Sequence, residues 1–191
     1  MSQRFYLDFY IKNQRERVKF SNSILSGVHH HLRGRALDNV GVSFPEFGKS
    51  FTDETVPFTG NVIRLISSNE VALFTLRGSE YFTSHILNGD VAVSQVKPVP
   101  EHATEVFFVR HRQPEYEARQ LKLLCPDNSK DITPYKVNKA SLTPSGMIKI
   151  FTIQKPLHMF VKMMDAPERI DGTFNSYGLC TMDKQVSVPW F

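Results

Sequence analysis

The chain has 191 residues, of which 41% are hydrophobic, 12% aromatic and 22% charged. This composition excludes a wholly disordered, collagen-like or low-complexity polymer and predicts one large or two small folded domains. The net charge of +4 is unevenly spread, because basic residues exceed acidic ones by eight to four over residues 1–50 and by twelve to eight over 110–191, whereas acidic residues lead by seven to three between them. A polyanion such as a nucleic acid is therefore expected to meet a surface built from the two ends of the chain.

The first hundred residues carry alternating strand and helix patterns. Residues 5–12 alternate in polarity as a half-buried strand does, and a helix is predicted over 21–33, with Ser21 or Ser23 as its N-cap. Gly41, in the strand predicted at 39–44, is expected to allow another backbone to approach closely. The other predicted elements are strands at 39–44, within 55–67 and from 91, and helical stretches at 69–76 and 80–87. This βαββαβ order is typical of ferredoxin-like domains.

The second half predicts a smaller set of elements. A strand is expected at 104–112, and a helix follows over 114–124, with Pro114 at its first position. A polar, turn-rich loop covers 126–140, and residues 147–153 and 157–163 are predicted as a hairpin. The fold class is therefore α+β, with a ferredoxin-like domain over 1–100 and a degenerate α+β domain over 101–191.

The sequence carries no sign of a membrane segment or of a disulfide framework. Its apolar runs are shorter than the roughly 18 to 20 residues that cross a bilayer, and its start lacks the layout of a signal peptide. A cytoplasmic protein is expected. Cys125 and Cys180 lack the spacing of metal ligands, so both are interpreted as buried thiols.

Three consecutive histidines, His29 to His31, fall on the first predicted helix. Their side chains point about 100° apart, so they cannot converge on one metal ion. A histidine can nevertheless exchange protons near neutral pH, and RNA carries its own nucleophile, the ribose 2′-OH. Hydroxyl-rich, basic and tyrosine-containing segments elsewhere in the chain favour an RNA-cleaving site that needs no bound metal.

Several motifs resemble those of one known family. They are NVGVSFP at 39–45, SLTPSG at 141–146, FNSYGL at 174–179 and the terminal VPWF. Together with FYLDFYIK and SILSGVHHHL, they are similar in order and spacing to the CRISPR repeat-cleaving endoribonucleases of the type I-F subtype. The resemblance extends from end to end of the chain. It implies a ferredoxin-like domain followed by a C-terminal region that grips an RNA hairpin.

The resemblance also implies a catalytic set and no cofactor. His30 matches the family's catalytic histidine, and a slip of one residue would name His29 instead. Ser141, with Thr143 as the alternative, matches the serine that holds the attacking ribose. Tyr177 matches the tyrosine that orients the histidine. Cleavage is expected at the 3′ base of the hairpin without a metal.

The RNA-binding residues implied by the resemblance come from the second half. Arg110 and Arg112 match two base-reading positions, and an arginine can bond O6 and N7 of guanine together. Arg112 departs from the family, where glutamine is usual, and the basic helix that follows is short. The remaining expected RNA contacts are Arg119, Lys122, Lys139 and Lys149, with Lys130 and Lys136 as further cations.

The leading functional hypothesis is a metal-independent endoribonuclease that leaves a 2′,3′-cyclic phosphate and a 5′-hydroxyl. The resemblance further implies that it stays on the cut hairpin and joins other subunits of a type I-F surveillance complex with the guide RNA. The alternative is a non-catalytic subunit that binds the hairpin, because ferredoxin-like domains often bind RNA without cutting it.

Overall fold

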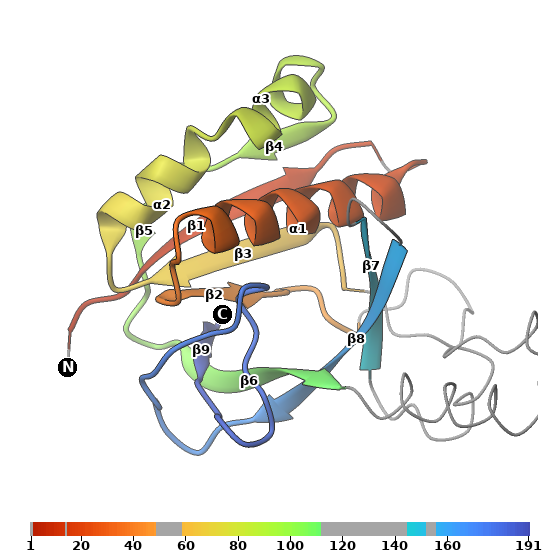
Figure 1. The fold of residues 1–191 in the computed structure, drawn as a ribbon. Helices are drawn as coiled ribbons and strands as arrows, with labels where there is room; N and C mark the ends of the chain where they lie inside the picture. Colours follow the sequence, from red (N-terminus) through yellow and green to blue (C-terminus); the bar gives the residue numbers. More distant parts are fainter. Residues whose placement is uncertain (1, 14, 49–58, 112–144, 152–155) are drawn as a thin grey trace, which may run out of the picture.

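Two antiparallel sheets form the framework of the protein (Figure 1). The structure is a computed structural model, and it describes residues 2–13, 15–48, 59–111, 145–151 and 156–191. For residues 111, 145–151 and 156–158 it describes the backbone only. The second sheet lies beyond one edge of the first, and one of its strands packs beside the first helix (Figure 1).

The first sheet has the strand order β2-β3-β1-β4, with the short β5 paired to β1. Every pairing in it is antiparallel, as in a ferredoxin-like domain, so the predicted fold class is confirmed. The strands are β1 (Phe5–Ile11), β2 (Val40–Ser43), β3 (Val62–Ser67), β4 (Val91–Val93) and β5 (Lys97–Pro98). The helices are α1 (Arg17–Gly34), α2 (Glu70–Arg77) and α3 (Glu80–Leu87).

Helix α1 begins earlier than the sequence predicted. Neither Ser21 nor Ser23 caps it, because the N-cap residue is Glu16, which makes no side-chain capping bond. Phe20 and Ile24, one turn apart, are both buried, so the apolar face of the helix extends past the serines. Burial of this face, and not a capping hydroxyl, therefore fixes where the helix starts.

The second sheet has the order β7-β8-β6-β9, and its pairings are antiparallel. It consists of β6 (Thr104–His111), β7 (Ser145–Phe151), β8 (Pro156–Asp165) and β9 (Val188–Trp190). The pairing of β7 with β8 confirms the predicted hairpin. The helix predicted at 114–124 and the loop predicted at 126–140 lie outside the described residues.

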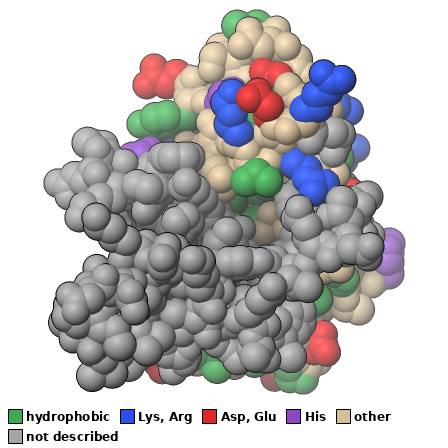
Figure 2. Space-filling model, turned by 90° about the vertical axis from the view of Figure 1, so that its right-hand side faces the viewer, with side chains coloured by type: hydrophobic (Ala, Val, Ile, Leu, Met, Phe, Trp, Pro, Cys, Tyr) green, Lys and Arg blue, Asp and Glu red, His purple; other side chains and the backbone are tan. Residues whose placement is uncertain are grey.

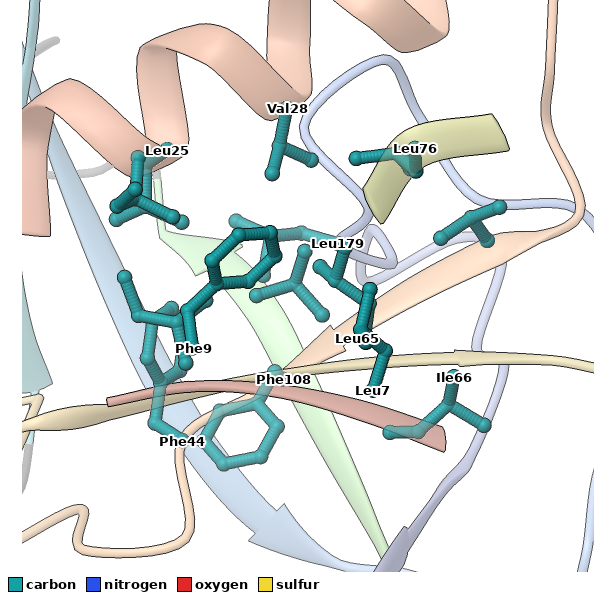
Figure 3. Packing of buried hydrophobic residues seen from close by; sticks show 14 of the residues in the cluster. Leu7, Phe9, Leu25, Val28, Phe44, Leu65, Ile66, Leu76, Phe108 and Leu179 are labelled. Atoms are coloured by element: carbon teal, nitrogen blue, oxygen red, sulfur yellow. The ribbon is translucent and has the colours of Figure 1, made fainter. Parts of the chain in front are cut away.

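One buried hydrophobic cluster includes side chains of both sheets. Figure 3 shows Phe108 of β6 and Leu179 of the C-terminal segment near Leu7 and Phe9 of β1. The ring of Phe108 meets that of Phe44 edge to face, with centroids 5.2 Å apart. The division at residue 100 falls between β5 and β6 and stays a prediction, because the core runs across it.

The face of the first sheet away from the helices holds a buried ion pair. Arg64 on β3 donates to both carboxylate oxygens of Asp8 on β1, at 2.7 and 2.9 Å, and the two side chains are 9% and 2% exposed. The Arg64 guanidinium also donates to a main-chain oxygen of Phe191 at 3.0 Å and lies 3.8 Å from the centroid of the Phe191 ring. The ion pair thus anchors the C-terminal residue to the first sheet.

Two further expectations concern membranes and thiols. Among the described residues, no helix has both the length and the apolar character needed to cross a bilayer. Cys180 is 2% exposed, and burial raises the pKa of its thiol, which confirms the prediction for this cysteine. Cys125 lies outside the described residues.

Replacing Asp8 tests the anchoring ion pair. Asp8→Ala leaves the Arg64 charge buried without its carboxylate, so we expect the free energy of unfolding to fall by about 3–5 kcal/mol. Glu16→Ala is the control, since Glu16 pairs with Lys19 where the two side chains are 48% and 65% exposed, and such pairs contribute about 0–1 kcal/mol. Urea unfolding of both variants measures the difference, and equal losses would contradict this role of Asp8.

Candidate active site

His29 lies on the buried face of α1 and contacts the C-terminal segment. Its side chain is 6% exposed, and its Nδ1 lies 3.0 Å from the carbonyl oxygen of Ser176. Its ring stacks on the ring of Tyr177, with centroids 4.2 Å apart and planes inclined by 11°. Residues separated by almost 150 positions thus form one side-chain cluster.

The contact with Ser176 determines which ring nitrogen of His29 carries the proton. A carbonyl oxygen can only accept, so Nδ1 donates and the neutral ring keeps its lone pair on Nε2. Burial lowers the pKa of His29 below its ordinary value of 6.5; the Ser176 bond opposes this shift, and nearby positive charges of His30, Arg33 and Arg110 add to it. At neutral pH the imidazole is therefore uncharged and able to accept a proton at Nε2.

A tight turn holds Tyr177 in place. The Oδ1 atom of Asn175 accepts hydrogen bonds from the backbone N–H groups of Tyr177 at 2.8 Å and Leu179 at 3.3 Å. Gly178 adopts a φ of +71°, in the left-handed region that favours glycine. The backbone N–H of Val42 on β2 donates to the Gly178 carbonyl at 2.7 Å, so the turn is fastened to the first sheet.

The same segment is fastened to the second sheet. The N–H of Cys180 donates to the carbonyl of Phe108 at 3.0 Å, and the N–H of Arg110 donates to the carbonyl of Cys180 at 3.1 Å. The Arg110 guanidinium consequently lies 5.5 Å from the centroid of the Tyr177 ring, within the range of a cation–π contact. Arg110, Tyr177 and His29 therefore form a row of three contacting side chains.

Close packing at Gly41 on β2 supports the turn that carries Tyr177. A Cβ atom there would lie 2.6 Å from the Phe174 ring and 2.8 Å from a methyl group of Val188. The close approach expected at Gly41 is thus made by side chains of the C-terminal segment. Because Phe174 precedes the turn that holds Tyr177, β2 helps to fix both ends of the turn.

His30, the first choice from the sequence, faces another part of the molecule. Its ring lies against Tyr81 on α3, with centroids 5.9 Å apart and planes inclined by 21°. The structure pairs Tyr177 with His29, which the family resemblance offered only as the alternative to His30. The helical periodicity of the sequence favours His29 over His30, because His29 is one turn from Leu25 and shares the helix face of Leu25 and Leu32. Both leucines are buried.

The structure does not describe the side chains of the other residues predicted from the second half. Lys149 lies on β7, of which only the backbone is described, and β7 packs beside α1. The remaining expected residues all lie outside the described part of the chain: Ser141, Thr143, Arg112, Arg119, Lys122, Lys130, Lys136 and Lys139. Of the predicted site, the structure therefore brings together Tyr177 and Arg110, with His29.

The side of the molecule where β1 ends and α1 begins is basic in its described part. Figure 2 shows several Lys and Arg side chains there, with acidic side chains between them. The adjoining sequence of residues 12–19 carries four basic residues and one acidic residue. This distribution agrees with the expectation that the N-terminal part contributes positive surface charge.

A comparison with protein families adds an independent finding. The family model described as "CRISPR-associated protein (Cas_Csy4)" matches residues 6–191, which is nearly the whole chain. The matched range includes α1 with its histidines, β6 with Arg110, and the turn that carries Tyr177. The match therefore covers all three side chains of the row.

Gly178→Ala tests whether the turn is as tightly held as its contacts indicate. A Cβ atom there would lie 2.5 Å from a Val42 methyl group and 3.0 Å from the Val42 nitrogen. With the strain of a positive φ, we expect a loss of roughly 2–5 kcal/mol in the free energy of unfolding. Gly89→Ala is the matched control, because Gly89 has a φ of +74° but nothing within 4 Å of the added atom, so it should lose only about 1–2 kcal/mol. Equal losses in chemical denaturation would count against a tightly packed turn.

Proposed function

The chain belongs to the CRISPR-associated Csy4 family, the pre-crRNA processing endoribonucleases of the type I-F subtype, and from this premise we propose how it acts on RNA. We propose that it cuts CRISPR repeat RNA at the 3′ base of the hairpin, without a metal ion, and that His29 is the general base. The observation that carries the proposal is the contact of His29 Nδ1 with the Ser176 carbonyl, because it leaves Nε2 as the proton acceptor.

The reaction is an internal transesterification. His29 Nε2 takes the proton of the ribose 2′-OH as that oxygen attacks the adjacent phosphorus. The new O2′–P bond forms while the P–O5′ bond breaks, and the leaving O5′ takes up a proton. The products are an upstream RNA that ends in a 2′,3′-cyclic phosphate and a downstream RNA that begins with a 5′-hydroxyl.

Tyr177 acts in this proposal as a positioning residue. Its ring covers one face of the His29 imidazole, and its turn supplies the Ser176 carbonyl that holds Nδ1. Ser141 is proposed to hold the ribose, with Thr143 as the alternative, as the family resemblance implies. The lowered pKa of His29 keeps the imidazole in its basic form at neutral pH, so activity is expected to fall only under more acidic conditions.

Arg110 is proposed to read a base of the RNA. Its guanidinium lies beside Tyr177, so a base that it reads would be next to the reacting ribose. Arg112 is proposed as its partner in base reading, and phosphate contacts are proposed for Arg119, Lys122, Lys139 and Lys149. Retention of the cut hairpin, and entry with it into a surveillance complex with other subunits, complete the proposal.

The adjacent histidines provide a matched pair of variants. His29→Ala should lower the single-turnover cleavage rate of repeat RNA by about 10²- to 10⁴-fold in excess chelator, since it removes the general base, while hairpin affinity stays close to that of the wild type. His30→Ala should lose much less at saturating RNA, because its ring lies against Tyr81 and not Tyr177. Cleavage followed on gels and binding by filter retention measure the two effects.

Several outcomes would contradict this assignment. A larger loss in His30→Ala than in His29→Ala would move the base to His30. Cleavage of an RNA with 2′-deoxyribose at the cut position would exclude the 2′-OH as nucleophile. Tight binding without any cleavage by the wild type would favour the non-catalytic hairpin-binding subunit.

A further inference from the structure

A groove of about 660 Å³ lies beside the His29 site, between the end of α1 and the junction of α2 with α3. His30 connects the two places, because its ring centroid is 5.7 Å from that of His29 and its side chain lines the groove. The side chains that give the groove its chemical character are His30, His31, Arg35, Ser79, Glu80 and Tyr81. The groove is thus largely polar, and the aromatic rings of Tyr81 and Phe74 also line it.

Tyr81 is an exposed aromatic ring on a rigid support. Its side chain is 46% exposed, although His30 lies against it with planes inclined by 21°. Close packing of α3 on α1 fixes its position, since a Cβ atom at Gly27 would lie 3.1 Å from the Tyr81 Cβ and 2.7 Å from the Phe82 ring. A supported ring with free surface is the kind of platform on which nucleic-acid bases stack.

The contacts also give the groove a direction relative to the cut. The rings of His29 and His30 have centroids 5.7 Å apart, so the row that starts at Arg110 continues through His29 and His30 to Tyr81. In the proposed function the hairpin lies on the Arg110 side of His29. The strand that passes the cut and leaves the hairpin would then run along the other side, toward Tyr81.

Positive charge favours an RNA strand in the groove. Arg35 lines it and Arg33 is exposed nearby, while Glu80 is the acidic residue that lines it among the described residues. His31 lines it too and is 5% exposed, and its Nε2 has no hydrogen-bond partner in the described part of the chain. Because this nitrogen is itself buried, the charge contributed by Arg33 and Arg35 carries the preference for RNA.

We propose that this groove binds the single-stranded RNA immediately downstream of the cut, with a base stacked on Tyr81. This inference rests on the proposed function and extends it, because it gives the enzyme a contact with the part of the repeat that lies outside the hairpin. The contact would hold the downstream strand until cleavage and would be lost from the retained product, since that product ends at the cut.

Hairpin RNAs with 2′-deoxyribose at the cut position test this binding directly. One RNA ends at the cut, a second carries a 3′ extension, and a third carries a 5′ extension, each of about four nucleotides, the lower end of single-strand site sizes. We expect the wild type to bind the 3′-extended RNA about tenfold more tightly than the RNA that ends at the cut, as one stacked base can provide. Tyr81→Leu should remove this gain, whereas Tyr81→Phe should keep it.

Leu87→Ser is the matched control on α3. Leu87 is 79% exposed and does not line the groove, so this variant should keep the full gain. Thermal unfolding of each variant confirms that α3 remains packed. The proposal fails if the wild type binds the first two RNAs equally, if Tyr81→Leu keeps the gain, or if only the 5′ extension produces it.

The two proposals fail in different ways. If the wild type cuts ordinary repeat RNA but the 3′ extension brings no gain, the groove proposal is overturned and the proposed function stands. If the hairpin is bound but never cut, and the gain still depends on Tyr81, the groove proposal stands without the nuclease. If neither cleavage nor hairpin binding occurs, both are overturned.

Discussion

The hydrogen bond between His29 Nδ1 and the Ser176 carbonyl is the constraint on which the candidate site depends. It joins the middle of the first helix to a turn near the C-terminal end, and it decides the chemical state of the imidazole. With the proton held on Nδ1, the lone pair on Nε2 is the one available for reaction. Stacking on Tyr177 then restricts rotation of the ring. The arrangement supplies an oriented and uncharged base from ordinary backbone and aromatic contacts.

The geometry of this bond depends on how the two sheets pack together. The turn that carries Ser176 and Tyr177 is hydrogen-bonded to β2 through Val42 and, just after it, to β6 through Phe108. The buried pair of Asp8 and Arg64 holds the last residue of the chain to the first sheet. Packing between the two halves is therefore part of the site, since a shift of one half against the other would move Ser176 away from His29.

Much of the framework was predictable from local patterns. Alternating polarity in residues 5–12 predicted β1, and the order of elements predicted the antiparallel sheet of a ferredoxin-like domain. The start of α1 could not be predicted in this way, because burial of Phe20 outweighed the capping preference of the serines. The short strand β9 was also missed, since its pairing with β6 is a long-range contact. Similarly, the choice of His29 over His30 requires knowing which helix face meets the C-terminal turn.

The tautomer and the pKa of His29 can be measured in solution, and together they decide whether its Nε2 can act as the base. Long-range ¹H–¹⁵N NMR correlations of the histidine rings, with the His29 signals assigned by their loss in His29→Gln, report which nitrogen carries the proton. We predict a neutral ring that is protonated on Nδ1 and titrates below 6.5, the ordinary pKa of histidine. A ring protonated on Nε2, or a pKa of His29 at or above 6.5, would contradict this prediction.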